Sequence, residues 1–144
     1  MLRLLIVNLL ALPGLLVFGQ VSMPSTTKVG LQELNILSQR TSDPIKLTEE
    51  TQGYYPTALI DGKCMVGFLG KVGGSFDAAV VDQVPIMIGA RKGDIVSFRI
   101  DIFHLDLING ITGLQYAELA GKAVPTLDKV VKATHADSVH AGIF

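Results

Sequence analysis

Residues 54–69 read YYPTALIDGKCMVGFL, and this stretch is the strongest indication of how the chain folds. Two apolar runs flank Asp61-Gly62, a dipeptide that suits the positive φ values of a two-residue type I′ turn. Pro56 has no N–H for a strand ladder, so we expect the first strand to be an edge strand or to begin after it. The predicted β-hairpin places three pairs on one face: Leu59 with Cys64, Thr57 with Val66, and Tyr55 with Phe68.

The longest strand candidate after this hairpin is Ile95–Leu107. Val96, Phe98 and Ile100 alternate with polar residues, which is typical of a half-buried strand. The alternation slips near Ile102-Phe103, and a β-bulge there would keep the apolar side chains on one face. Turn-forming residues predict loops at 70–78 and 89–94, with two shorter strands at Ala79–Val81 and Val84–Ile88.

The flanking segments have weaker patterns. Residues 28–37 show both an alternation and a three-residue spacing of leucines, and we favour a strand. The polar run 38–53 is expected to be a loop with a short strand at Ile45–Thr48. Leu114–Ala120 is expected to be a strand or a short helix. Thr126 is a suitable helix N-cap, because residues beyond it have helical spacing: Leu127, Val130, Val131 and Thr134.

Short strands with glycine-rich turns predict an all-β or β-rich α+β fold. The expected architecture is a small antiparallel β-sandwich or barrel with a short C-terminal helix. Strands and helices do not alternate regularly, which disfavours a doubly wound nucleotide-binding fold. The chain has 144 residues, of which 49% are hydrophobic and 17% charged, so it can form one domain with an aliphatic core. We assign that domain to residues 28–144.

The first 19 residues have the pattern of a signal peptide. Arg3 provides the positive charge, and residues 4–18 form an apolar stretch shorter than the roughly 20 residues of a membrane span. Small residues at Val17 and Gly19 place the cleavage site after Gly19. We therefore expect a secreted, extracellular protein without a stable membrane anchor after cleavage, with residues 20–27 as a flexible leader. The alternative is an uncleaved membrane anchor.

The composition excludes several classes of function. Twelve basic and thirteen acidic residues give a net charge of −1, which argues against a nucleic-acid binder. The single cysteine excludes an intrachain disulfide and any multi-cysteine metal site. The chain has no N-glycosylation sequon, no Gly-x-Ser-x-Gly motif and no phosphate-binding loop. We therefore expect no catalytic residue, no metal and no cofactor.

Cys64 is the one thiol of the chain. In the predicted hairpin it lies opposite Leu59 and beside Val66, and we expect it to be a small buried hydrophobic side chain. An odd cysteine in a secreted chain can also form an intermolecular disulfide, which is the alternative.

Two groups of polar residues are candidates for binding. Asp101, His104 and Asp106 would share the polar face of the bulged strand. An imidazole and two carboxylates can hold a divalent metal, although the solvated side of an amphipathic strand is the simpler interpretation. Loops at one end of a sandwich are frequent binding sites, and here the turn regions carry three cations: Lys71, Arg91 and Lys92.

These patterns favour a secreted, non-enzymatic binding domain that acts through surface loops, as an effector, a toxin or a lectin does. The expected partner is a protein, a carbohydrate or a second copy of the chain. One alternative is a small extracellular hydrolase that uses carboxylates such as Asp101 and Asp106. Another is a structural protein that self-associates through exposed edges such as Tyr54–Ile60. A third is a carrier that holds an apolar ligand inside a barrel.

Overall fold

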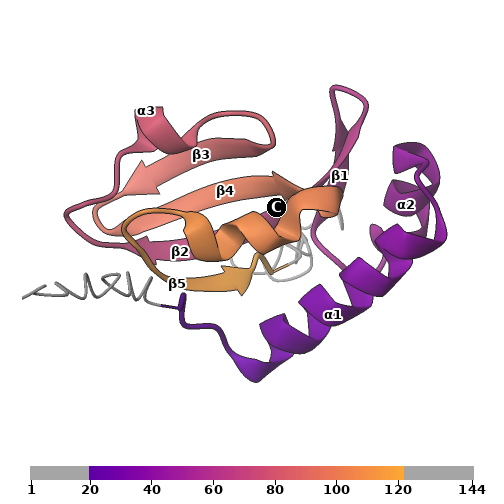
Figure 1. The fold of residues 1–144 in the computed structure, drawn as a ribbon, viewed down its shortest axis with the longest axis horizontal. Helices are drawn as coiled ribbons and strands as arrows, with labels where there is room; N and C mark the ends of the chain where they lie inside the picture. Colours follow the sequence, from indigo (N-terminus) through magenta and orange to yellow (C-terminus); the bar gives the residue numbers. More distant parts are fainter. Residues whose placement is uncertain (1–19, 122–144) are drawn as a thin grey trace, which may run out of the picture.

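The computed structural model describes residues 20–121, and Figure 1 shows their arrangement. Helices and strands follow one another as α1 Ser25–Arg40, α2 Pro44–Thr51, β1 Thr57–Ile60, β2 Lys63–Val72, α3 Ala78–Val81, β3 Ile86–Lys92, β4 Ile95–Asp101, the 3₁₀ helix η1 Ile102–Gly110, and β5 Leu114–Leu119. The five strands form one antiparallel sheet, so the fold is a β-rich α+β fold.

Strand β2 organises this sheet. The strand order is β1-β2-β4-β3, and β4 pairs with β2 along one edge from Met65 to Lys71. The other edge of β2 is shared by β1 and β5. β1 begins and β5 ends beside Gly67 of β2, whose N–H donates to the Pro56 carbonyl at 2.8 Å and whose carbonyl accepts from the Ala120 N–H at 3.0 Å.

The predicted hairpin is confirmed. Leu59 pairs with Cys64 and Thr57 with Val66. Asp61 and Gly62 have φ values of 49° and 72°, as a type I′ turn requires. The expected pair of Tyr55 and Phe68 does not form, because β1 begins after Pro56 and Phe68 pairs with Leu119 of β5 instead.

The expected sandwich or closed barrel is wrong. The sheet is single and open, and its second layer is helical, since α1, α2 and η1 pack against strands on one face (Figure 1). The core lies between these layers and consists mainly of aliphatic side chains. Its fully buried members include Leu34 of α1, Leu47 of α2, Val66 of β2, Ile100 of β4 and Ile108 of η1.

Three segments that the sequence analysis assigned to strands are helical. Residues 28–37 lie in α1, where the leucine spacing places Leu34 in the core. Ile45–Thr48 lies in α2, because Asp43 accepts a hydrogen bond from the Ile45 N–H at 3.0 Å and Pro44 occupies the first turn. Asp77 caps α3 in the same way, which makes the expected strand Ala79–Val81 a helical turn.

The predicted β-bulge at Ile102-Phe103 is also wrong, because β4 ends at Asp101 and η1 begins. In a 3₁₀ helix, side chains three residues apart lie above one another. Ile102, Leu105 and Ile108 of η1 are buried at this spacing although the chain kinks at His104, and the change from strand to helix explains the slip in the apolar alternation. Leu114–Leu119 is a strand, and two strands extend into the expected loops 70–78 and 89–94.

Residues 20–27 are part of the fold and not a flexible leader. Val21 is buried, and Ser22 forms a parallel bridge with Tyr116 of β5. The Ser22 N–H donates to the Gln115 carbonyl, and the Ser22 carbonyl accepts from the Ala117 N–H, both at 3.0 Å. These contacts use the main chain, so the polar side chains of the segment do not reveal them. The expected signal peptide and C-terminal helix lie outside the described residues. Within residues 20–121, no helix is both long and apolar enough to cross a bilayer.

Candidate functional site

A cleft of about 560 Å³ lies between α1 and η1. Part of its lining is apolar and includes Leu31 of α1 and Leu105 of η1, both of which pack against the core. Val21 and Met23, from the segment that precedes α1, add to the apolar part, and Gln20 of the same segment and several residues of both helices supply the polar part. The cleft therefore combines apolar contact area with several side chains that can donate or accept hydrogen bonds.

The conformation of each helix determines which side chains reach the cleft. In α1, the polar lining residues Lys28, Gln32 and Asn35 follow one another at four and three residues, so they share one face of the helix. In η1, the chain kinks at His104, where φ is −131° and ψ is 29°; Phe103 precedes this kink, Asp106 and Asn109 follow it, and all three line the cleft. Both helices thus present polar side chains to the cleft, and η1 adds an aromatic ring.

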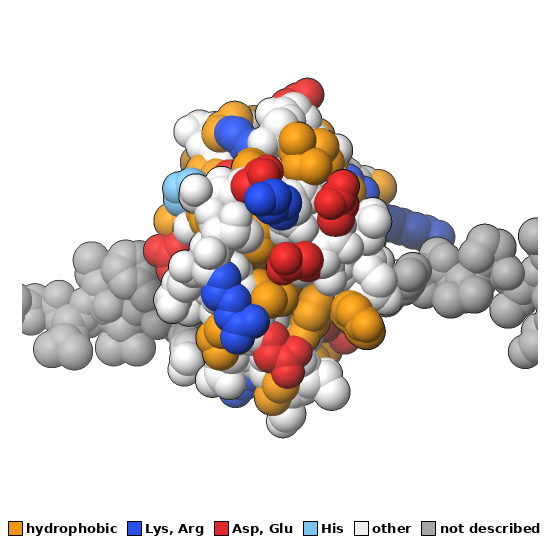
Figure 2. All heavy atoms as spheres, turned by 90° about the vertical axis from the view of Figure 1, so that its right-hand side faces the viewer, with side chains coloured by type: hydrophobic (Ala, Val, Ile, Leu, Met, Phe, Trp, Pro, Cys, Tyr) orange, Lys and Arg blue, Asp and Glu red, His pale blue; other side chains and the backbone are white. Residues whose placement is uncertain are grey.

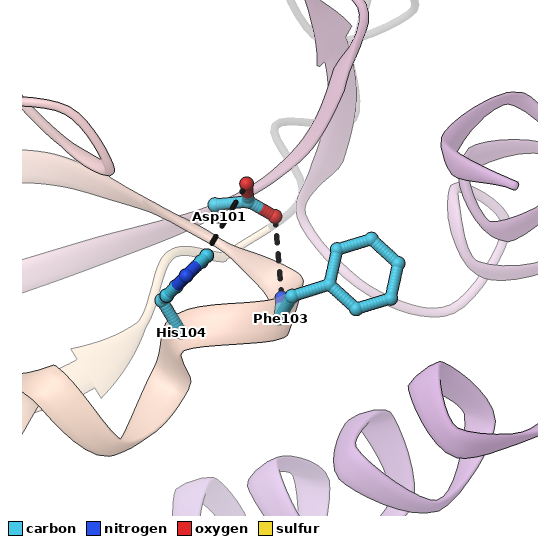
Figure 3. Close-up of polar contacts among 3 residues, drawn as sticks. All are labelled: Asp101, Phe103 and His104. Carbon is cyan, nitrogen blue, oxygen red and sulfur yellow. Dashed lines mark hydrogen bonds and ion pairs between the residues drawn. The ribbon is translucent and has the colours of Figure 1, made fainter. Parts of the chain in front are cut away.

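Asp101 fixes the beginning of η1, as Figure 3 shows. Its side chain is the N-cap of the helix and accepts a hydrogen bond from the Phe103 N–H at 3.2 Å. The same carboxylate lies 3.7 Å from Nδ1 of His104. Asp101 is buried, whereas the Phe103 ring is 39% exposed and points away from the Asp101–His104 pair (Figure 3). The cap therefore positions an aromatic ring at the cleft.

The three residues predicted as one polar cluster are divided by the fold. Asp101 and His104 form a pair at the start of η1, while Asp106 lines the cleft with α1. The expected common face is wrong because these residues lie on a 3₁₀ helix and its cap, not on a strand. In the described part of the chain, no three His, Cys, Asp or Glu residues are grouped as metal ligands would be.

The three predicted loop cations lie at strand ends near the β3–β4 turn. The register places Lys71 and Lys92 on either side of Ile95. Lys71 forms an exposed salt bridge with Asp94, at 3.5 Å between Nζ and Oδ2. Such a pair contributes at most about 1 kcal/mol to stability. The Arg91 guanidinium lies 5.5 Å from the centre of the Phe76 ring. Lys71 and Arg91 are thus engaged in local contacts.

Acidic and basic side chains are interspersed on the surface near α2. Figure 2 views the molecule from the right-hand side of Figure 1, and acidic and basic side chains alternate over that face. A nucleic-acid binder needs basic side chains gathered on one face. The face in Figure 2 does not have this distribution.

Cys64 is fully buried and unpaired, as the hairpin pattern predicted. Burial raises the pKa of its thiol, although hydrogen bonds with Thr48 and Thr51 of α2 act in the opposite direction. The reactive thiolate is therefore disfavoured. A disulfide to a second chain would require this part of the core to open.

The chain matches no protein-family model, and no curated protein or solved structure is significantly similar to it. The cleft between α1 and η1 is therefore the best indication of function. Sequence analysis identified Asp106 but missed Phe103, which it placed on the apolar side of a strand. It also missed Gln32, Asn35 and Asn109. Part of the signal for η1 was present in the sequence, because the apolar residues Ile102, Leu105 and Ile108 are three residues apart; this spacing does not mark Phe103 or Asn109 as cleft residues.

Proposed function

We propose that this chain is a secreted, non-enzymatic binding domain that binds a carbohydrate in the cleft between α1 and η1. The observation that carries the proposal is the half-exposed ring of Phe103 beside a set of amide and carboxylate side chains on two facing helices. We take the ligand to be a short, uncharged oligosaccharide.

Sugars present two kinds of surface, and the cleft has a counterpart for each. The C–H groups of a pyranose ring form a flat apolar patch, which can lie on an aromatic face such as that of Phe103. The hydroxyl groups both donate and accept hydrogen bonds. Side-chain amides do the same with fixed geometry, and Gln32, Asn35 and Asn109 provide them, while Asp106 accepts. A volume of about 560 Å³ suits a ligand of a few sugar rings.

Other functions receive less support from the same residues. A glycoside hydrolase needs two carboxylates on opposite sides of the scissile bond. Asp106 lines the cleft, but Asp101 is buried as a helix cap and does not line it. A carrier would need an enclosed apolar interior, whereas the sheet is open. These observations favour binding over hydrolysis or transport.

Phe103→Ala is expected to weaken sugar binding at least about tenfold, because a central aromatic contact carries much of the energy of a small site. Leu107→Ala is the matched control: it lies on the same helix with a similar exposed fraction, 37% against 39%, and does not line the cleft. Binding is measured by NMR titration of the ¹⁵N-labelled full chain with a panel of neutral mono- and oligosaccharides.

Amide shifts should be confined to α1 and η1, and Asn35→Ala should weaken binding in the same direction as Phe103→Ala. The proposal fails if none of the sugars shifts these signals, or if Leu107→Ala weakens binding as much as Phe103→Ala. A peptide that shifts the same signals while no sugar does so would assign the cleft to a protein partner instead.

Secretion has its own test. Among residues 20–121, Val21 is the first buried side chain and Ser22 the first residue bridged to the sheet, so cleavage after Gly19 would keep both of these contacts. We expect the exported protein to begin at Gln20. Intact mass spectrometry of the protein recovered from the medium measures this directly. A mass that retains residues 1–19 would contradict the proposed cleavage and favour a membrane-anchored domain.

A further inference from the structure

The second face of the sheet points away from α1, α2 and η1, and we call it the open face. The register assigns it the alternate residues that the core does not use, in rows that cross the strands. One row consists of Gly67, Arg99 and Met87, and the next row begins with Leu69 and Ser97. Leu69 and Met87 are 39% and 38% exposed, so the face presents apolar side chains.

A groove of about 520 Å³ runs over this face. Gly67 lines this groove and places no side chain in it. A Cβ at this position would lie only 3.3 Å from the Pro56 carbonyl oxygen, so a larger residue would crowd the chain at Pro56. Arg99 is the one charged residue that lines the groove. It forms no salt bridge with the acidic residues of the described range. An apolar groove with one unpaired cation suits an amphipathic occupant with an acidic group near its apolar side.

The chain itself enters this groove as it leaves the sheet. Ala120 and Gly121 follow β5 and both line the groove. The Ala120 N–H donates to the Gly67 carbonyl at 3.0 Å, which holds the exit point at the middle of β2. Beyond Gly121 the sequence continues with residues 122–144. Thirteen helical residues span about 20 Å, and four strands span about 15 Å, so a short helix of this segment is long enough to cross the sheet.

The sequence of the segment also has the pattern that the groove needs. Leu127, Val130 and Val131 have the spacing of one helix face. With about 100° per residue, Asp137 falls at the border of this face, while Lys129 and Lys132 fall on the opposite side. The pattern thus places an acidic group beside the apolar residues and the lysines toward solvent.

We propose that residues 122–144 cover the open face of their own sheet. The aliphatic residues of the segment lie over Leu69 and Met87, and Asp137 lies at Arg99. This inference concerns the face opposite to the carbohydrate cleft and does not depend on the proposed function.

Thiol labelling of the full chain tests this arrangement. A Leu69→Cys variant reports on the groove, Met87→Cys is a second reporter on β3, and Glu49→Cys on α2 is the exposed reference. Cys64 is buried and is expected to stay unlabelled in each variant. We expect maleimide to label Cys at positions 69 and 87 about tenfold more slowly than at position 49, because covered sites react only after local opening.

The second arm changes the segment and leaves the sheet intact. Val130→Asp with Val131→Asp should raise the labelling rate at position 69 about tenfold, since charges in the apolar stripe prevent docking. Lys129→Asp, a charge change on the opposite side of the same segment, should leave the rate unchanged. Circular dichroism of each variant verifies that the sheet is folded.

Two results would overturn the proposal. If positions 69 and 87 react as fast as position 49 in the otherwise unchanged chain, the face is open. If they are protected only at high protein concentration, a second copy covers the face and not the segment. The carbohydrate cleft lies on the opposite face of the sheet. The labelling rates therefore test the docking of residues 122–144 and not the binding of sugars, so either proposal can fail without the other.

Discussion

Phe68→Ala is expected to lower the free energy of unfolding by about 3–5 kcal/mol. Phe68 lies in the middle of β2 and is 1% exposed. Its ring stacks on that of Phe98, its direct neighbour on β4, with 5.2 Å between ring centres and an angle of 13°. Leu119 of β5 lies on its other side. Truncation would therefore leave a cavity where three strands meet the helical layer.

Ile95→Ala provides the comparison within the same sheet. Ile95 lies at the beginning of β4 and is 47% exposed, so its truncation should cost less than about 1 kcal/mol. Urea denaturation of both variants measures the difference, with an unchanged m value as the sign that the unfolding transition is still two-state. Equal losses would contradict the assignment of the core to the helix-covered face.

Gly113→Ala should cost about 2–5 kcal/mol, for two reasons that add. Gly113 has a φ of 81°, and a left-handed conformation costs a residue with a Cβ about 1–2 kcal/mol. In addition, the new Cβ would clash with the backbone nitrogen of Phe76. Overpacking of this kind lowers the free energy of unfolding by about a further 1–3 kcal/mol. The Phe76 segment would have to move, and with it the contact of its ring with Arg91.

Gly62→Ala separates the two contributions. Gly62 has a similar φ of 72°, but a Cβ there meets no atom within 4 Å. Its loss should therefore be limited to the conformational cost of about 1–2 kcal/mol. Thermal unfolding followed by circular dichroism compares the two variants. If both lose the same stability, the segment at Phe76 yields without cost and the close contact does not constrain it.

The sequence predicts best where local chemistry and burial agree. The hairpin at Asp61-Gly62 is correct in turn type and register, because both depend on neighbouring residues. The alternation of Val96, Phe98 and Ile100 correctly identifies β4 for a similar reason. Helix α2 was missed although its start is local: Asp43 and Pro44 are an N-cap and a first-turn residue. The polar composition of residues 38–53 outweighed that signal.

The candidate site was harder to predict because it joins residues far apart in the chain. Asn35 and Phe103 line one cleft only because α1 packs beside η1 on the same face of the sheet. Nothing in the sequence near either residue specifies this packing. The buried residues Ile102, Leu105 and Ile108 are three residues apart, but the chain kinks at His104, so this spacing alone does not predict that Phe103 and Asp106 line the same cleft. An interpretation based on strand alternation alone assigned these side chains to the wrong faces.

The shared edge of β2 limits how this fold can vary in length. Because β1 begins and β5 ends beside the same residue of β2, Gly67, neither strand can be extended toward it without displacing the other. A residue inserted near Pro56 or Ala120 would break main-chain hydrogen bonds on both sides of this junction. Among the described strands, the hairpin tip at Asp61-Gly62 has no such neighbour on that edge. Natural length variants of this fold, and designed peptide insertions, should therefore be accommodated at the tip of the hairpin.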